Sequence, residues 1–423
     1  MLRTIFILFL FGLACLACRS QQNPVEKGSI LPHQLIKTDT TLTYALYVPN
    51  SVNDIASSNC IIFFDPSGKG EYPLEQYENL AEQYQVVLVG NNNSRNGMDF
   101  NSIMMNFQPL LNELKTIYHI PPQHITLWGF SGGAKAVMYA ADLMSELDKV
   151  IYGGAYYPIY SKKKILGFNG TQDMNYSELN DYNISQKNNK DHLQIEFDGK
   201  HHWPDTATAA NAFIWLKLQQ VDNNSPWVKS YAEELKNEYA EHLANKQFYR
   251  AKNTLDKALF MLYGKTDISY FQAEKNSLKL KSEFKKEIAA RNTVQQQEQQ
   301  LKNYYAQRFF TEKADWWEKE IKKLNESSNP MYHRLVAFFS LSAYSLSNSA
   351  LRNNDLESAE KILTIYQLAD PENTEQAFLR ALLYARLNNF AKSKAALDEA
   401  KKLGFTNWQR VKENPYLKFY NEY

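Results

Sequence analysis

The sequence predicts an α/β fold with a doubly wound, mainly parallel sheet, followed by an all-α region. Two observations support this prediction. Short apolar runs alternate with amphipathic helical segments in the first half of the chain, a pattern typical of a parallel sheet with helices on both faces. Beyond about residue 222 the strand-like runs stop, and Lys, Glu, Gln, Ala and Leu recur with helical periodicity. We therefore expect an α/β domain over residues 41–221 and a helical domain over 227–423.

The expected strands are short and mostly apolar. The run 42–48 alternates along its length and ends at Pro49, which is typical of an edge strand. The other runs are continuously apolar, as expected for strands that are buried on both faces of a parallel sheet. They occupy residues 61–64, 86–89, 125–129, 150–154, 165–168 and 193–197.

Helices are expected between these strands, over residues 73–84, 103–119, 134–147 and 206–220. Pro73 stands in the first turn of the first helix, where its missing N–H has no partner to lose. Pro121 and Pro122 stop the second helix. Because ligands of such sheets bind at the carboxyl ends of the strands, we expect the functional residues in the loops at that edge.

One pentapeptide marks the most informative junction between a strand and a helix. Gly129-Phe130-Ser131-Gly132-Gly133 follows an apolar run and opens into a helix of small and apolar residues. This order is typical of a nucleophile elbow, in which a sharp turn presents a strained serine. A Cβ atom at Gly129 or Gly133 is expected to collide with the neighbouring strand and helix. The alternative is a glycine-rich turn without chemical meaning.

Two later loops, each just past an expected strand, supply an acid and a base. Asp173 lies in Gly170-Thr-Gln-Asp-Met-Asn-Tyr176, and His201 and His202 lie in Gly199-Lys-His-His-Trp-Pro204. The order Ser, Asp, His along the chain is that of the triad of α/β-hydrolases and differs from the other two well-known serine-hydrolase orders.

In these motifs the chain resembles the α/β-hydrolase superfamily, most closely its compact secreted branch of polyhydroxybutyrate-depolymerase-like and feruloyl-esterase-like proteins. The resemblance covers residues 40–220 and includes Phe63-Phe-Asp-Pro-Ser-Gly68, where the family places its first oxyanion loop. It implies that Ser131 is the nucleophile, His201 the general base and Asp173 the acid that orients the histidine. It also implies a serine hydrolase acting on a carboxylic ester, less readily on an amide, without a cofactor.

Alternatives exist for the base and for the acid. His202 is adjacent to His201, so in a loop only one of them can face the serine, and the resemblance favours His201 through the family spacing Gly-x-His-x-Trp-Pro. Asp198 and Asp205 stand too close in sequence to the histidine to reach its far nitrogen well, which favours Asp173. Adjacent histidines without a matching ligand spacing predict no metal site.

The oxyanion hole is expected to use two backbone N–H groups. Gly132 should give the first, as the residue after the nucleophile. The second should come from the loop after the first buried strand, where Pro66 has no N–H, so that Ser67 or Lys69 must supply it. The loop Asn91–Gly97 should line the crevice, either contacting a polar substrate such as a sugar or simply forming a turn.

The N-terminus predicts a bacterial lipoprotein. A positive start and an apolar run to Ala17 form a signal-peptide pattern that is too short to span a bilayer. The segment Leu-Ala-Cys18 resembles a lipobox, and Cys18 fits better than Cys15 because polar residues follow it at once. This predicts a signal peptide over 1–18, a tether over 19–40 and an anchor in the cell envelope on a periplasmic or surface face. The alternative is an ordinary secreted protein.

The helical region carries a weak internal repeat. Arg352-Asn-Asn-Asp-Leu356 aligns with Arg386-Leu-Asn-Asn-Phe390 at an offset of 34 residues, the tetratricopeptide period. Phe248–Ala258 matches Phe390–Ala400, and Ala369–Asn373 resembles the proline-containing turn between repeats. We therefore expect an irregular, tetratricopeptide-like solenoid, a type of module that usually contacts proteins.

Composition and motifs together limit the classes of partner. A formal net charge of +1 gives no electrostatic reason to expect nucleic acid. The expected partners are a small-molecule or carbohydrate-linked ester, a protein at the helical repeats, and a membrane through the lipid anchor. Two rival functions are a catalytically silent, hydrolase-fold binding or assembly lipoprotein, and a serine peptidase. The peptidase is disfavoured because no propeller precedes the hydrolase segment as in prolyl-oligopeptidase-like enzymes.

Overall fold

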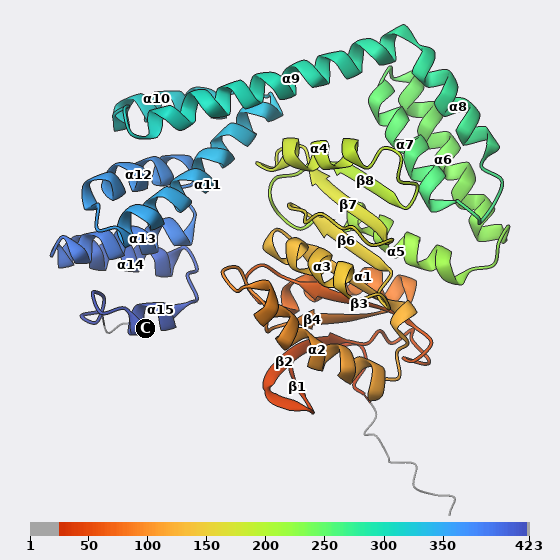
Figure 1. The fold of residues 1–423 in the computed structure, drawn as a ribbon, viewed down its shortest axis with the longest axis horizontal. Coiled ribbons are helices and arrows are strands. Elements are labelled where there is room, and N and C mark those ends of the chain that lie inside the picture. The colour runs from red at the N-terminus through yellow and green to blue at the C-terminus, as the bar shows by residue number, and fades with distance from the viewer. Residues whose placement is uncertain (1–24, 421–423) are drawn as a thin grey trace, which may run out of the picture.

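The computed structural model describes residues 25–420, and the first half of these residues forms an eight-stranded sheet (Figure 1). Its strands are β1 (Ile30–Ile36), β2 (Asp39–Tyr47), β3 (Asn59–Phe64), β4 (Val86–Asn91), β5 (Ile125–Phe130), β6 (Lys149–Gly153), β7 (Lys164–Gly170) and β8 (His192–Phe197). They lie in the order β1-β2-β4-β3-β5-β6-β7-β8. The pairs β1–β2 and β2–β4 are antiparallel, and every pair from β4 to β8 is parallel.

Helices cover both faces of this sheet. They are α1 (Glu71–Tyr84), α2 (Phe100–Thr116), α3 (Gly132–Leu143), α4 (Tyr176–Ser185) and α5 (Thr206–Gln220), with a short 3-10 helix η1 (Pro122–His124) before β5. In β3, Ile61 and Phe63 pack in one apolar cluster with α1 and α5, whereas Ile62 and Phe64 pack in another with α2 and α3. Burial on both faces explains why this strand is apolar throughout. The predicted fold class, a doubly wound and mainly parallel α/β sheet followed by helices, is confirmed.

The N-terminal part differs from the predicted tether. The signal peptide, Cys18 and residues 19–24 lie outside the described residues, but residues 30–36, predicted as tether, form β1. Most of the strand is partly or fully exposed and its register shifts along β2, so the regular alternation that marks a strand is missing from the sequence. Because β1 covers the outer side of β2, the strand predicted at 42–48 is not an edge strand.

A second element was not predicted from the sequence. The helix α4 follows β7 and buries only Tyr176, Leu179 and Tyr182. The rest of its sequence is mostly Ser, Asn and Asp, which compete for backbone hydrogen bonds and have low helix propensity. Packing against the sheet therefore stabilises a segment whose local sequence favours a loop.

The rest of the chain is helical. It consists of α6 (Pro226–Ala244), α7 (Phe248–Met261), α8 (Ser269–Leu280), α9 (Ser282–Ala306), η2 (Gln307–Phe309), α10 (Ala314–Asn325), α11 (Pro330–Arg352), α12 (Leu356–Ala369), α13 (Thr374–Arg386), α14 (Phe390–Lys402) and α15 (Trp408–Glu413). Ser225 and Asn329 cap α6 and α11, and each is followed by a proline whose fixed φ suits the first helical position. Within residues 25–420, no helix is both long and apolar enough to cross a membrane.

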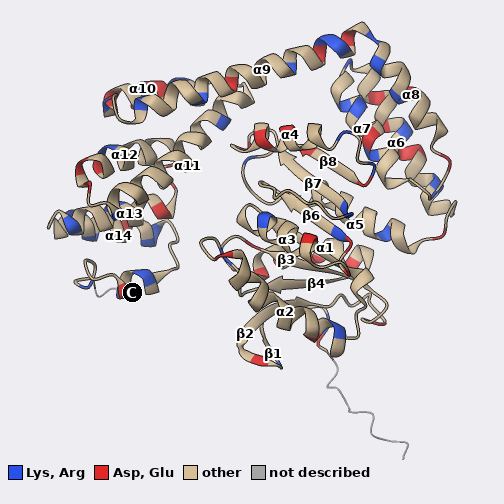
Figure 2. Cartoon of the chain, viewed as in Figure 1, with Lys and Arg blue, Asp and Glu red and all other residues tan. Residues whose placement is uncertain are grey.

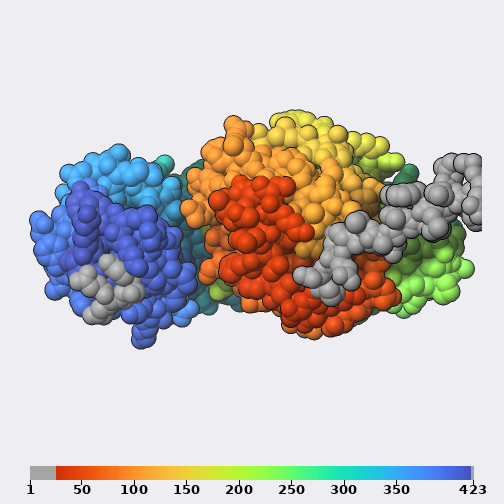
Figure 3. Space-filling model, turned by 90° about the horizontal axis from the view of Figure 1, so that it is seen from below, coloured from red at the N-terminus to blue at the C-terminus, as the bar shows by residue number. Residues whose placement is uncertain are grey.

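The helices divide between two apolar clusters. Buried residues of α6, α7 and α8, among them Val228, Leu255 and Phe271, belong to the cluster that covers one face of the sheet. Residues from Tyr305 to Tyr420 form a separate cluster. Figure 1 shows α9 crossing from the first group to the second, and Figure 3 shows the C-terminal helices as a mass beside the α/β part. The domain boundary predicted near residues 221–227 thus falls inside a shared cluster, and it stays a prediction.

The turns of the C-terminal hairpins recur at the predicted offset. Asn354 and Asn388, 34 positions apart, have φ of 60° and 56°. In both turns the N–H of the next residue bonds to the carbonyl five positions back, at 2.9 and 2.8 Å. This is the hydrogen bond of a Schellman helix end. Figure 2 shows charges of both signs along these helices and along α6–α9, in keeping with the formal net charge of +1.

Candidate active site

Ser131 occupies a sharp turn between β5 and α3. Its φ of 53° and ψ of −122° lie outside the regions that L-residues ordinarily adopt. Its N–H donates to the Gly153 carbonyl at 2.8 Å, so the hydrogen bonding of β5 with β6 continues into the turn. The sheet and the helix therefore hold Ser131 in a strained conformation at the carboxyl edge of the sheet.

The two flanking glycines allow the close approach that this turn requires. A Cβ atom on Gly129 would overlap the carbonyl of Gly133, and a Cβ atom on Gly133 would overlap the carbonyl of Phe64. Both obstacles are backbone atoms, which no rotamer change can move. The collision predicted at these two positions is therefore present.

The structure brings Ser131, His201 and Asp173 into one hydrogen-bonded chain. The His201 Nε2 atom lies 2.9 Å from Ser131 Oγ, and His201 Nδ1 lies 2.9 Å from each carboxylate oxygen of Asp173. With Nδ1–H donating to the carboxylate, Nε2 is left to accept the serine proton. Asp173 is 1% exposed, whereas the His201 side chain is 20% exposed. The Asp173 carboxylate is thus shielded from water, whereas the His201 imidazole is partly exposed.

Backbone hydrogen bonds hold the two loops that carry the acid and the base. We call residues 170–176 the acid loop. Its Thr171 N–H donates to Phe197 and its Gln172 N–H to Gly199, both at 2.8 Å, so the pairing of β7 with β8 continues past the strand ends. The Asn175 N–H donates to the Asp173 carboxylate at 2.8 Å, which fixes the orientation of the acid.

The alternative bases and acids have other partners. His202 accepts from the Lys200 N–H at 3.3 Å and donates to the Trp203 carbonyl at 2.7 Å, both within its own loop. Asp198 accepts from Thr171, and Asp205 caps α5. Of the three acids considered from the sequence, Asp173 is the one that hydrogen-bonds to the imidazole of His201. Among residues 25–420, no cluster of three or more His, Cys, Asp and Glu side chains is placed to hold a metal ion.

Asp65 joins the loop after β3 to the histidine loop. Its carboxylate accepts from the indole N–H of Trp203 at 3.1 Å and from the backbone N–H of Ser67 at 2.9 Å. Trp203 is 3% exposed and packs among aromatic rings, including Phe63, which makes it a packing anchor. Because the Ser67 N–H already donates to a carboxylate, the structure disfavours it as the second oxyanion donor. Gly132 and Lys69 stay predictions, Gly132 as the first residue of α3, whose N–H has no intrahelical acceptor.

The loop after β4 contributes a residue that the sequence did not single out. The Asn96 N–H donates to the Pro66 carbonyl at 2.8 Å, and a Cβ atom on Gly132 would overlap the Asn96 carboxamide. Asn92 and Asn93 instead hydrogen-bond to β1 and β2. Of these asparagines, Asn96 is therefore the one beside the elbow. The run of turn-forming residues identified the loop, but only the fold distinguishes its members.

Comparison with known proteins gives neighbours in structure but not in sequence. No protein-family model matches the chain, and no curated protein matches it. A carboxylesterase from Mesorhizobium loti is similar, with 17% identity and a TM-score of 0.34, over 44% of this chain and 99% of that one. A feruloyl esterase module from Clostridium thermocellum has 12% identity and a TM-score of 0.38, over 44% and 87%.

A dienelactone hydrolase from Anabaena variabilis is similar at 15% identity and a TM-score of 0.33, over 42% of this chain and 89% of that one. These structures are esterases and hydrolases of the α/β-hydrolase fold, and each covers less than half of the chain. The likeness is one of fold over the α/β part. At these identities and TM-scores, it transfers no activity to this chain.

Proposed function

We propose that the protein is a serine hydrolase that cleaves a carboxylic ester through an acyl intermediate on Ser131. One observation supports this above all others: 2.9 Å hydrogen bonds link the Ser131 hydroxyl to His201 and His201 to the buried carboxylate of Asp173. A free serine hydroxyl is a weak nucleophile at neutral pH, and a hydrogen-bonded base is what activates it. The strained turn at Ser131 gives the hydroxyl a fixed direction toward that base.

The proposed reaction follows from this arrangement. Ser131 Oγ attacks the ester carbonyl carbon while His201 Nε2 takes the serine proton. Asp173 holds the imidazole in position and stabilises the imidazolium that forms. When the tetrahedral intermediate collapses, His201 gives its proton to the departing alkoxide. A water molecule then repeats the sequence on the acyl-serine and releases the carboxylic acid.

The developing oxyanion would be stabilised by the Gly132 N–H at the N-terminus of α3, where the helix dipole also favours negative charge. For the second donor we propose Lys69 N–H or the carboxamide of Asn96. The Asn96 carboxamide lies against Gly132 with Oδ1 nearer than Nδ2, so its NH2 group can donate to the oxyanion only after the amide turns. An amide side chain is an effective donor in other oxyanion holes.

A fluorophosphonate probe separates this function from a catalytically silent binding lipoprotein. We expect the wild-type protein to be labelled at Ser131 and the Ser131→Ala variant to be unlabelled while it keeps its circular dichroism spectrum. A wild-type protein that is folded but never labelled would favour the silent alternative. Labelling that persists in the variant would place the nucleophile elsewhere.

Paired substrates separate the esterase from the peptidase. We propose that p-nitrophenyl acetate is turned over much faster than a matched p-nitroanilide. A small-molecule or carbohydrate-linked ester is the proposed substrate class. Faster anilide hydrolysis would instead support the serine peptidase.

We also propose that a lipid on Cys18 anchors the protein in the bacterial cell envelope, on the basis of the Leu-Ala-Cys18 pattern. The wild-type protein should partition into the detergent phase of a Triton X-114 extract, and Cys18→Ser should shift it to the aqueous phase. A Cys15→Ser variant is the control for the alternative site. Aqueous partitioning of the wild type would leave an ordinary secreted protein.

The C-terminal helices are proposed to form a tetratricopeptide-like module that contacts a protein. The recurrence of the same helix-end turn at Asn354 and Asn388, at the 34-residue period of that repeat, supports the proposal. Cross-linking of the full chain in cells, compared with a chain that ends before α12, would identify or exclude such a partner.

A further inference from the structure

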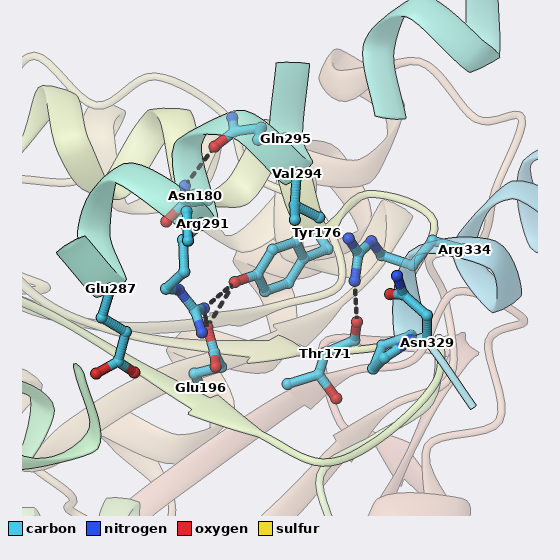
Figure 4. Close-up of a pocket in the computed structure, with 12 residues that line it drawn as sticks. Thr171, Tyr176, Asn180, Glu196, Glu287, Arg291, Val294, Gln295, Asn329 and Arg334 are labelled. Carbon is cyan, nitrogen blue, oxygen red and sulfur yellow. Dashed lines mark hydrogen bonds and ion pairs between the residues drawn. The ribbon is translucent and has the colours of Figure 1, made fainter. Parts of the chain in front are cut away.

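Two cations from the helical half of the chain bind the backbone of the acid loop. Arg334 of α11 donates from Nη1 to the Thr171 carbonyl at 2.6 Å, and Lys302 of α9 donates from Nζ to the Met174 carbonyl at 3.1 Å. These two carbonyls lie on either side of Asp173 in the sequence. Figure 4 shows Arg334 reaching the loop from above its carbonyl, beside the ring of Tyr176.

A buried carboxylate orders both cations. Glu298 of α9 is 0% exposed, and its two oxygens lie 2.9 Å from Lys302 Nζ and 2.5 Å from Arg334 Nη2. The Arg334 side chain is itself only 6% exposed. Fully buried charges persist only where partners compensate them, and the geometry of such a network is correspondingly fixed. The Glu298–Lys302–Arg334 network, which we call the bracket, therefore holds the backbone of the acid loop in position.

This side of the acid loop borders a pocket that is open to solvent. The pocket has a volume of about 290 Å³ and lies between α9, α11 and the end of the sheet. It is lined by Thr171, Tyr176, Asn180, Glu196, Glu287, Ala290, Arg291, Val294, Gln295, Asn329, Pro330 and Arg334. Thr171 and Tyr176 face this pocket, so on that side the hydrogen bonds from Arg334 and Lys302 are among the contacts that hold the loop.

Other contacts hold α9 in register with the α/β part. Arg291 pairs with Glu196 of β8 at 2.6 Å, and Gln295 donates to Asp181 at 2.6 Å (Figure 4 shows the Arg291 contact). β8 is the last strand of the sheet and α7 packs against it, so α9 reaches this edge through the Arg291 side chain. The long helix thus sets where Lys302 stands relative to Asp173.

We propose that Arg334 and Lys302, ordered by Glu298, are positioning residues for Asp173, so that the helical half of the chain completes the catalytic triad. This inference deepens the hydrolase proposed above and depends on it. Arg334 and Lys302 touch neither Ser131 nor His201. They act by fixing the backbone on both sides of Asp173, and through it the direction of the His201 imidazole.

The matched variants are apolar replacements of similar length. Removing Arg334 alone leaves the buried Glu298 with one partner and can unfold the region. The triple variant Glu298→Met/Lys302→Met/Arg334→Met removes the whole network without leaving a buried charge unpaired. Its control is Arg380→Met/Glu399→Met, which removes a 2.7 Å ion pair between α13 and α14.

Three measurements test the proposal on the full chain: kcat and KM with p-nitrophenyl acetate, circular dichroism, and amide hydrogen exchange of the acid loop. A catalytic group displaced by about 1 Å loses on the order of 100-fold in rate. We expect the triple variant to remain folded, to lose about 10- to 100-fold in kcat with little change in KM, and to exchange faster over residues 170–176. The control should change kcat less than about twofold.

The outcomes separate this inference from the proposed function. If the wild type is active and Ser131→Ala is not, the hydrolase stands, and a folded triple variant with unchanged kcat overturns the positioning role. If the triple variant is unfolded, Lys302→Met, which leaves the Glu298–Arg334 pair in place, must still reduce kcat and accelerate exchange near Met174. A wild-type protein that neither hydrolyses the ester nor is labelled at Ser131 would refute the proposed serine-hydrolase function. In that case, unchanged exchange in the triple variant would also refute the bracket.

Discussion

The two adjacent histidines offer a sharp test of the proposed mechanism. His201 Nε2 lies 2.9 Å from Ser131 Oγ, whereas both ring nitrogens of His202 are engaged by the backbone of their own loop. Replacing either histidine by alanine removes the same imidazole group from one of two adjacent positions, so each variant is the control for the other. His201→Ala should therefore abolish base catalysis, and His202→Ala should only loosen the loop.

The expected magnitudes follow from these contacts. Loss of the base from a serine triad lowers kcat by about 10³-fold or more, equivalent to about 4 kcal/mol of transition-state stabilisation. His202 makes two hydrogen bonds to the backbone, each contributing about 1 kcal/mol to folding. The loop also keeps Trp203, bound to Asp65 at 3.1 Å. We therefore expect less than a tenfold loss in kcat for His202→Ala.

The assay is steady-state hydrolysis of p-nitrophenyl acetate by both variants, with circular dichroism as the control for folding. A larger loss in His202→Ala than in His201→Ala would refute the assignment of the base. Equal losses in two folded variants would mean that the loop as a whole, and not one imidazole, limits the rate.

Three further outcomes are expected. Gly133→Ala should lower the free energy of unfolding by about 3 kcal/mol, because the added Cβ overlaps a backbone carbonyl. Gly264→Ala, at a glycine of positive φ in open space, should lower it by about 1 kcal/mol. Urea titrations in which Gly133→Ala is not the more destabilising variant would contradict the close packing at the elbow. Burial lowers the pKa of His192 to about 3 from 6.5. Below about pH 6.5 His192 therefore binds a proton in the unfolded chain but not in the folded one. The free energy of unfolding should fall by about 2 kcal/mol between pH 6.5 and 5. His192→Gln should remove this loss. A chain ending at Asn224 should melt well below one ending at Lys281, because α6–α8 share an apolar cluster with the sheet; equal melting temperatures would show that the shared cluster is not needed.

The sequence predicted those parts of the protein that local patterns determine. The elbow around Ser131 and the strand ends before Asp173 and His201 have short-range signatures, so both the fold class and the hydrogen-bonded chain of side chains could be anticipated. The strand β1 and the helix α4 could not, because tertiary packing outweighs their weak local propensity. The sequence also could not rank Ser67 against Lys69 as the second oxyanion donor, because it does not reveal that Asp65 accepts the Ser67 N–H.

The network on the acid loop was beyond any local pattern. Glu298 stands in a glutamine-rich stretch that is typical of a solvated helix face, yet it is fully buried. Thr171 and Arg334 are 163 positions apart, and nothing in either segment signals the other. Only the path of α9 past the end of the sheet brings them together.

The late position of Arg334 in the chain has a consequence for protein synthesis. By the time His201 has been translated, all three triad side chains exist, but Arg334 follows 133 residues later (334 − 201). At 5–20 residues per second, the ribosome needs on the order of 10 s to reach it. During that interval the nascent α/β segment can fold, but the loop that carries Asp173 still lacks its hydrogen bond from Arg334. Hydrolytic competence would then arise near the end of translation, and prematurely terminated chains would leave the ribosome with a poor active site.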